Sequence, residues 1–159
     1  MILAFNDALQ FGFFCRPMVM ACGCFDILTA GHVRHLQAAK KLGKHLCVLV
    51  TADKHVSKGA GRPVFLEDRR AEVVDALGCV DSVVINPRPT AAGAILMFSP
   101  DVYVKGREYK NNLTPSLLAE LEALESVGGR LEFTETEEVH TTNVVARLLE
   151  WEDQPLGAV

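Results

Sequence analysis

Several features that would place this chain in a specialised class of protein are missing from its 159 residues. No apolar stretch approaches the ~20 residues that a membrane-spanning helix needs, so we expect no membrane partner. The 16 lysine and arginine residues are outnumbered by 20 aspartate and glutamate residues, and the net charge of −4 argues against a nucleic-acid partner. Any anionic ligand must therefore be held by a local site.

The sequence also lacks the cysteine spacing of a metal site. Its five cysteines are scattered among apolar runs, and the Cys22-x-Cys24 pair has no second Cys/His pair at a finger-like distance. We therefore expect that no residue binds a metal ion. We also expect the thiols to be reduced and the protein to be cytoplasmic. Residues 1–17 carry no early positive charge, and Asn6 and Asp7 interrupt their apolar run, so we predict no signal peptide.

Short apolar runs alternate with amphipathic segments along the chain. His45–Thr51 is nearly all apolar, which is typical of a parallel strand covered on both faces. Thr114 and Pro115 provide a capping hydroxyl and a proline at the first helical position, and Gly128-Gly129 ends that helix. We predict strands over residues 18–22, 45–51, 80–85, 102–105 and 131–133, and helices over about 31–42, 66–77, 91–98, 115–127 and 141–151.

This order predicts an α/β fold with a doubly wound, five-stranded parallel sheet. One domain would span residues 18–152, followed by a tail over 153–159. Residues 1–17 would be an N-terminal extension that packs on the domain or on a partner, or that precedes the natural start of the chain.

The turn after the first predicted strand has the sequence GCFDILTAGH, from Gly23 to His32. A glycine lets the backbone approach a ligand closely, and the free N–H groups at a helix start attract anions. Ligands of doubly wound sheets bind beyond the carboxyl ends of the strands, where the strand order reverses. We therefore predict a phosphate site here, faced by His32, with Asp26 buried and fixing the turn through hydrogen bonds to backbone N–H groups.

Further candidate phosphate-binding residues follow other predicted strands. Lys58 lies in a basic, glycine-containing loop, Arg69 and Arg70 begin the next helix, and Lys105 ends a strand at the same edge of the sheet. Lys58 and the two arginines also fit ordinary solvated positions, whereas Lys105 follows an apolar strand into the same crevice and is more than a surface charge.

The last predicted helix begins with Thr141 and Thr142. Two hydroxyl groups beside free N–H groups predict a second phosphate site, although a simple helix cap would account for one of them.

The segment from Gly23 to His32 resembles the G-x-F-D-x-x-H-x-G-H signature of the cytidylyltransferase-like nucleotidyltransferases. The resemblance is strongest to the nucleotidyltransferase domain of bacterial ADP-heptose synthases and covers about residues 19–147. It rests on the motifs GCFDILxAGHVRHL (23–36), VLVTADKHVSKGAGRPV (48–64), LEDRR (66–70), CVDSVVI (79–85), SPDVYVKGREY (99–109) and GGRLEF (128–133).

The resemblance implies a Rossmann-like fold, Mg²⁺ as a cofactor, a homodimer, and direct transfer between a nucleoside triphosphate and a phosphorylated sugar or alcohol. We expect AMP transfer from ATP to a sugar phosphate. The alternatives are cytidylyl transfer to glycerol 3-phosphate or a similar alcohol, and a relative that binds nucleotides with weakened catalysis.

The resemblance also assigns roles to residues. The catalytic residues would be His32, Lys58, Arg69 and Thr29. The nucleotide-binding residues would be Gly23, Cys24, Phe25, Gly31, His32, Lys105, Gly106, His140, Thr141 and Thr142.

Two positions depart from the family pattern. Thr29 replaces the first histidine of H-x-G-H, and the loss of one such donor costs ~10²–10³ in turnover in other enzymes. His140 replaces the serine that usually precedes the paired threonines. One hypothesis is that His140 supplies the donor missing at position 29, and the alternative is two independent changes.

Overall fold

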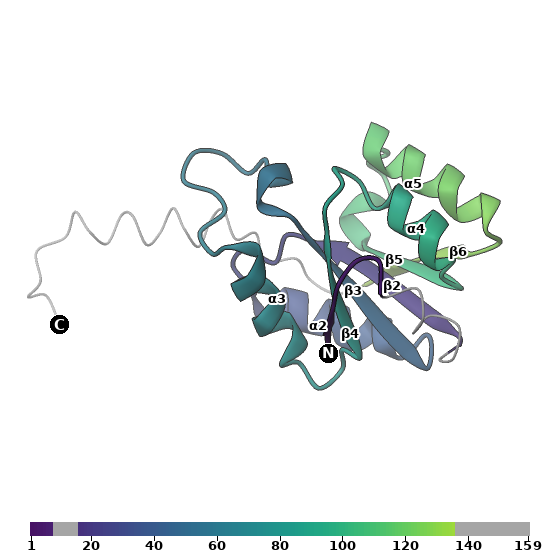
Figure 1. Cartoon of the computed structure of the whole chain (residues 1–159). Coiled ribbons are helices and arrows are strands. Elements are labelled where there is room, and N and C mark those ends of the chain that lie inside the picture. Colours follow the sequence, from purple (N-terminus) through teal and green to yellow (C-terminus); the bar gives the residue numbers. More distant parts are fainter. Residues whose placement is uncertain (8–15, 136–159) are drawn as a thin grey trace, which may run out of the picture.

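A computed structural model describes residues 1–7 and 16–135 of the chain. The predicted helix over 141–151 lies outside these residues. Within them, all the strands are parallel and form one sheet in the order β1-β4-β3-β2-β5-β6 (Figure 1). The strands are β1 (Ile2–Leu3), β2 (Met18–Gly23), β3 (His45–Thr51), β4 (Ser82–Asn86), β5 (Val102–Gly106) and β6 (Arg130–Thr134). The predicted parallel α/β fold is confirmed.

The sheet has one strand more than the sequence predicted. Ile2 pairs with Val83 and Leu3 with Val84, which places β1 at the edge of the sheet beside β4. Two residues are too short a run to show strand periodicity, so the pattern gave no signal there. Phe5 then packs against Phe98 with ring centroids 5.5 Å apart, so Phe5 as well as β1 contacts the domain.

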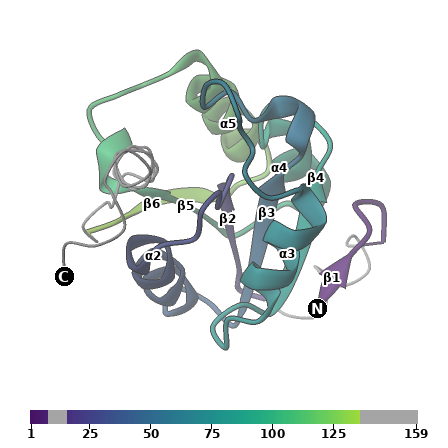
Figure 2. The same ribbon diagram turned by 90° about the vertical axis from the view of Figure 1, so that its left-hand side faces the viewer.

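Helices cover both faces of the sheet (Figure 2). They are α2 (Ala30–Lys40), α3 (Glu67–Asp75), α4 (Ala92–Phe98) and α5 (Pro115–Ser126). The predicted cap of α5 is confirmed, because the Thr114 hydroxyl accepts the Leu117 N–H at 3.2 Å.

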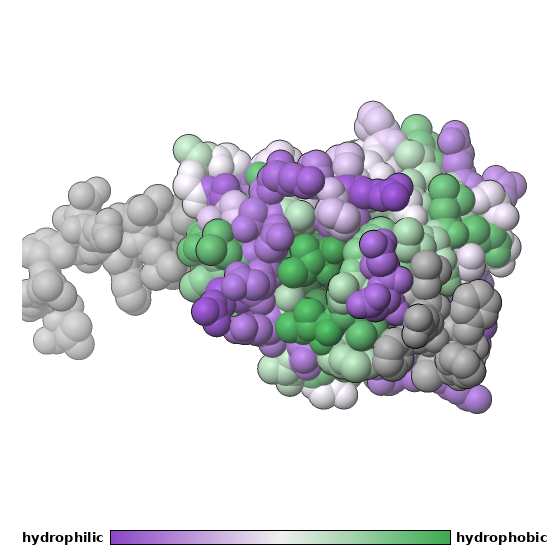
Figure 3. Space-filling model, viewed as in Figure 1, coloured by the Kyte–Doolittle hydropathy of each residue, from purple (hydrophilic) through white to green (hydrophobic). Residues whose placement is uncertain are grey.

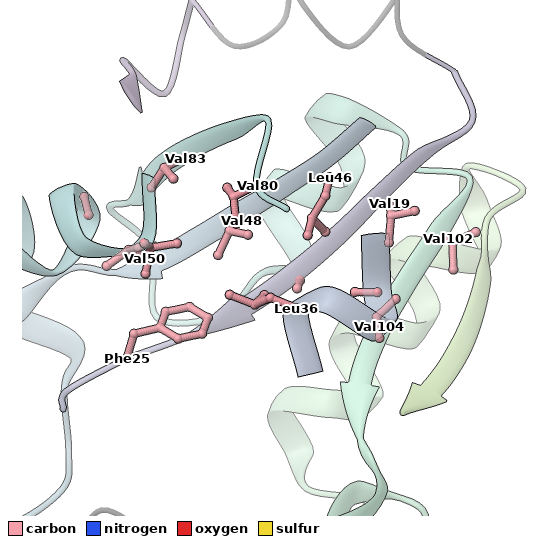
Figure 4. Packing of buried hydrophobic residues seen from close by; sticks show 14 residues of the cluster. Val19, Phe25, Leu36, Leu46, Val48, Val50, Val80, Val83, Val102 and Val104 are labelled. Carbon is pink, nitrogen blue, oxygen red and sulfur yellow. The ribbon is translucent and has the colours of Figure 1, made fainter. Parts of the chain in front are cut away.

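Each face of the sheet has its own apolar core. Alternate residues of β3 point to opposite faces, so that Val48 joins the core under α2 and α3 while Leu49 joins the core under α4 and α5. Figure 4 shows the first of these cores, with the Phe25 ring at the end of β2 directed toward Leu36 of α2. Burial on both faces explains the continuous apolar run of β3.

The strand order reverses between β2 and β5. The chain proceeds from β2 through β3 to β4 on one side and then returns to place β5 on the other side of β2, where Ala21 pairs with Val104. The ends of β2 and β5 therefore lie side by side, with the start of α2 beside them. This is the position at which doubly wound sheets bind ligands.

The exposed surface mixes polar and apolar side chains, as the face in Figure 3 shows. The larger exposed apolar side chains include Phe65 and Leu66 just before α3 and Val73 within it. None of the helices in the described part of the chain is long and apolar enough to cross a membrane.

Candidate functional site

A pocket of about 270 Å³ opens at the carboxyl ends of the central strands. The start of α2 forms one side of it, and residues 89–91 together with Glu120 form another. It brings together many of the residues singled out from the sequence. These are Gly23, Cys24, Phe25, Thr29, Gly31, His32, Lys58, Lys105 and Gly106.

Thr29 and His32 cap the start of α2 together. The Thr29 hydroxyl accepts the His32 backbone N–H at 3.5 Å, and the Thr29 backbone N–H donates to His32 Nδ1 at 3.1 Å. This is the reciprocal arrangement of a capping box, with histidine in place of the usual glutamate or glutamine. The residue that departs from the family signature is therefore the N-cap of the helix that carries the remaining histidine.

The capping contact also fixes where the His32 ring carries its hydrogen. A backbone N–H can only donate, so Nδ1 is the acceptor and the hydrogen of the neutral ring lies on Nε2. Burial, followed by the positive charge of Lys58, lowers the pKa of His32 below its ordinary value. At neutral pH the ring is thus an uncharged Nε2–H donor in the pocket.

Phe25 shapes the turn between β2 and α2. It has a φ of 51°, and its ring packs edge-on against the His32 ring with centroids 5.5 Å apart. A Cβ at Gly23 would lie 3.0 Å from the Phe25 ring, so a larger residue there would require the ring to shift by a few tenths of an ångström. The Gly23–Phe25 contact therefore supports one side of the His32 ring.

Asp26 anchors the loop that contains Lys58. The side chain is fully buried and accepts the backbone N–H groups of Val64 at 2.9 Å and Phe65 at 3.0 Å, and the Arg62 Nε at 2.7 Å. Burial alone would raise the pKa of Asp26, but these N–H groups and the guanidinium hold it below its usual value. The predicted burial and backbone bonding are confirmed, and the donors belong to the loop after β3 rather than to the turn itself.

The two arginines at the start of α3 have different environments. Arg69 does not line this pocket: its side chain is 66% exposed and pairs with Glu72 at 3.0 Å, so its catalytic role stays a prediction. Arg70 is buried and donates to the carbonyl of Thr51 at 2.7 Å, and also to the carbonyl of Cys24. Arg70 thereby ties the ends of β2 and β3 together.

Lys105 lies in the pocket as half of a buried ion pair. Its Nζ is 3.0 Å from Glu120 Oε2, and the same carboxylate accepts the Tyr103 hydroxyl at 3.0 Å and the Ala91 N–H at 3.1 Å. Burial would lower the pKa of Lys105, but the Glu120 carboxylate holds it above its ordinary value. Lys105 is therefore a fixed positive charge, and sequence reasoning missed its partner because nothing in the pattern marks Glu120.

His35 also lines the pocket and was not singled out from the sequence. It lies one turn after His32 on α2, and its Nδ1 is 2.7 Å from the Thr134 hydroxyl at the end of β6. The spacing of three residues between the histidines was the available signal. The predicted contacts His140, Thr141 and Thr142 lie outside the described residues.

The carboxylates of the pocket do not form a dedicated metal cage. No group of three or more His, Cys, Asp or Glu residues that could hold a metal ion occurs in residues 1–7 and 16–135. Glu120 is already paired, which leaves Glu108 as the other carboxylate in the pocket lining. This donor set fits a Mg²⁺ that is bound mainly by substrate phosphates, the common mode for this ion.

Fold and site together define the chain as a Rossmann-like α/β protein whose pocket, at the strand-order reversal, is lined by the start of α2 and by Lys58 and Lys105. The cytidylyltransferase-like family model matches residues 20–147. The chain belongs to this family of nucleotidyltransferases.

Individual relatives agree with this assignment. The chain is 36% identical over 142 residues to the bifunctional protein HldE of Syntrophotalea carbinolica, covering 87% of this chain and 28% of the relative. It is 40% identical to the protein of the same name from Geotalea uraniireducens, over 84% of this chain and 27% of that protein. The chain thus spans little more than a quarter of the length of these curated relatives.

Two solved structures share the fold. The lipopolysaccharide core biosynthesis protein from Thermoplasma volcanium superposes with a TM-score of 0.60 at 28% identity, over 77% of this chain and 97% of that one. The pantothenate synthetase from Thermus thermophilus superposes with a TM-score of 0.59 at 15% identity, over 87% and 62%, and this likeness concerns the fold alone.

Proposed function

We propose that this chain transfers AMP from ATP to a sugar phosphate and releases pyrophosphate. The observation that carries the proposal is His32, a neutral Nε2–H donor at the amino end of α2, in one pocket with Lys58 and Lys105. Hydrogen-bond donors, a helix start and lysine ammonium groups are the chemistry that recognises phosphate oxygens. The choice of ATP and a sugar phosphate follows the motifs shared with ADP-heptose synthases.

The reaction we propose is a direct in-line displacement. An oxygen of the acceptor phosphate forms a bond to the α-phosphorus, and the bond from that phosphorus to the oxygen bridging to the β-phosphate breaks, so that pyrophosphate leaves with the electron pair. Mg²⁺ bound to the phosphates would neutralise part of their charge. The chain itself positions the two substrates and stabilises charge on the phosphate oxygens, which are the dominant contributions to this type of reaction.

Each pocket residue has a defined part in this scheme. His32 Nε2–H donates to a phosphate oxygen, while Thr29 holds the other ring nitrogen. Lys58 binds the polyphosphate, and its loop is held in place by Asp26. Gly23 and Phe25 bring the backbone close to the nucleotide. Thr141 and Thr142, which lie outside the described residues, would bind the same phosphates if the helix predicted from the sequence forms there.

A second candidate function is nucleotide binding without efficient turnover. The observation in its favour is the Thr29 hydroxyl, which is already engaged by the His32 N–H and ring and so replaces a histidine with a group committed to capping. The intact His32 and Lys58 favour the enzyme.

Pyrophosphate release separates these functions. Purified protein with Mg²⁺ would be assayed with ATP or CTP, each with heptose 1-phosphate or glycerol 3-phosphate. We expect release with ATP and heptose 1-phosphate, at least tenfold slower in His32→Gln. Release should be unchanged in His45→Gln, because His45 lies at the start of β3 and its ring contacts Ser82 at the start of β4. Release only with CTP and glycerol 3-phosphate would establish the cytidylyl alternative, and nucleotide binding without release would establish the second candidate function.

A further inference from the structure

His35 occupies a position in the pocket that the reaction scheme above does not use. It lines the same pocket as His32 and lies three residues further along α2, so the two imidazoles share one face of the helix. Its ring is held from the opposite side by β6, through the 2.7 Å contact between Nδ1 and the Thr134 hydroxyl. Two separate elements, α2 and β6, therefore fix one imidazole at the pocket wall.

Both histidines are held at Nδ1 by a threonine. The Thr29 backbone N–H donates to Nδ1 of His32, and the Thr134 hydroxyl lies against Nδ1 of His35. Among the described residues, neither Nε2 atom has a hydrogen-bond partner. Nε2 is thus the ring nitrogen that each histidine offers to a ligand.

The groups around His35 leave room for a neutral donor. Lys105 from β5 is the charged neighbour of its ring and is itself paired with Glu120, while His32 from α2 is neutral at neutral pH and Thr134 contributes a neutral hydroxyl from β6. Burial, then His32 and Lys105, lowers the pKa of His35 to about 4, so the ring is neutral at physiological pH. A neutral imidazole adds a hydrogen-bond donor to the pocket without the cost of burying another positive charge.

We propose that His35 is a second imidazole contact of this pocket, donating its Nε2 hydrogen to a phosphate oxygen of the ligand while Thr134 holds the ring. The proposal rests on the proposed function only in taking a phosphorylated ligand for this pocket. The phosphate could belong to the nucleotide or to the acceptor, and both present the same oxyanion chemistry.

Two substitutions of His35 test whether its Nε2 contacts the ligand. Asn at position 35 keeps a polar group where Nδ1 meets Thr134 but does not reach as far as Nε2, whereas Gln places a polar group near Nε2. A ligand contact predicts that His35→Asn binds phosphate about ten- to a hundred-fold more weakly, the range for losing a bond to a charged group. It also predicts that His35→Gln recovers part of the loss. A purely structural role of the contact with Thr134 predicts the opposite: His35→Asn would bind phosphate better than His35→Gln.

His45 provides the matched control. It is also a buried imidazole bonded to a hydroxyl, with Nε2 2.8 Å from Ser82 Oγ, but it lies at the start of β3, at the end of the strand away from the pocket. His45→Asn should leave phosphate affinity unchanged. Thermal unfolding of each variant shows whether it is folded.

The measurement is calorimetric titration with Mg·ATP in one arm and mannose 1-phosphate in the other. Weaker binding of His35→Asn in the first arm alone assigns the contact to the nucleotide, and in the second arm alone to the acceptor. Histidine ring ¹⁵N spectra should show the His35 Nε2 resonance shifting on binding, with His45 unchanged. Wild-type affinity in both arms for folded His35→Asn would overturn the proposal, while phosphate binding without pyrophosphate release would contradict only the proposed function.

Discussion

The Thr29 backbone N–H donates to His32 Nδ1 at 3.1 Å, and the Thr29 hydroxyl accepts the His32 N–H in return. The two residues therefore form a reciprocal cap at the start of α2. The cap occupies Nδ1 of His32 and leaves Nε2 facing the pocket. A threonine that looks like a loss in the sequence pattern is, in the fold, the residue that orients the remaining histidine.

The helix cap predicts a specific effect of Thr29→Ala. Loss of a threonine N-cap costs about 1 kcal/mol of stability. Thr114→Ala is the matched control, since Thr114 caps α5 with a 3.2 Å bond to Leu117 N and is not part of the pocket lining. We expect similar losses in urea unfolding for both variants, but weaker Mg·ATP binding only for Thr29→Ala, because this variant loses the hydroxyl that lies 3.0 Å from His32 Nδ1 and keeps only the backbone N–H on the ring. Equal ATP affinity in the two variants would contradict an orienting role for the Thr29 hydroxyl.

The sequence hypothesis for His140 has its own test. If His140 supplies the donor missing at position 29, Thr29→His should leave pyrophosphate release unchanged and His140→Ala should abolish it. Faster release by Thr29→His together with full activity of His140→Ala would contradict the hypothesis. Steady-state rates for the two variants and the wild type are sufficient.

The buried Asp26–Arg62 pair should be sensitive to single substitution. Asp26→Asn removes the charge that compensates Arg62, whose side chain is 5% exposed, and weakens the acceptor of Val64 N and Phe65 N. Breaking a buried pair on one side costs about 3–5 kcal/mol. Urea unfolding should show this loss, with weaker ATP binding because the Lys58 loop loses its anchor.

Glu132→Gln is the control for that measurement. Its pair with Arg130 on β6 is exposed, so we expect a change of about 0.5 kcal/mol or less. Equal losses for Asp26→Asn and Glu132→Gln would mean that Asp26 does not anchor the loop.

Stability should fall in mild acid because of His35. The unfolded ring binds a proton near pH 6.5, whereas the folded ring does so only near pH 4. Between these values the unfolded state holds more protons, so the free energy of unfolding decreases as the pH falls through this window. His35 contributes at most about 3 kcal/mol to this decrease.

Urea unfolding at pH 7 and pH 4.5 measures the effect. His35→Asn should lose less stability between the two pH values than the wild type does. The pKa values of His32 and His45 are also lowered, so some decrease persists in the variant. An identical decrease in both proteins would show that the folded His35 ring is not held neutral.

The strands and helices were predictable because each carries its own signal. The nearly all-apolar run of β3 and the Thr114-Pro115 cap are local features, and the fold places them as expected. β1 was missed because Ile2 and Leu3 become a strand only through pairing with β4. The family signature likewise located the pocket, since its residues cluster within Gly23–His32.

The contacts that complete the pocket were not predictable in the same way. Asp26 was expected to be buried, but its partners Val64 and Phe65 lie in a loop more than thirty residues away. The partners of Lys105 and His35 come from α5 and β6, and no local pattern joins them. Such pairs exist only once helices have packed on the sheet, so a single sequence does not reveal them.

The central claim is that the His32 pocket binds a nucleoside triphosphate. Calorimetric titration of the wild type with ATP, CTP, GTP and UTP in the presence of Mg²⁺ tests it without knowledge of the acceptor. We predict that ATP binds most tightly and that His32→Gln weakens its affinity at least tenfold, while His45→Gln does not. Failure of all four nucleotides to bind the wild type, or equal ATP affinity in His32→Gln, would contradict the account.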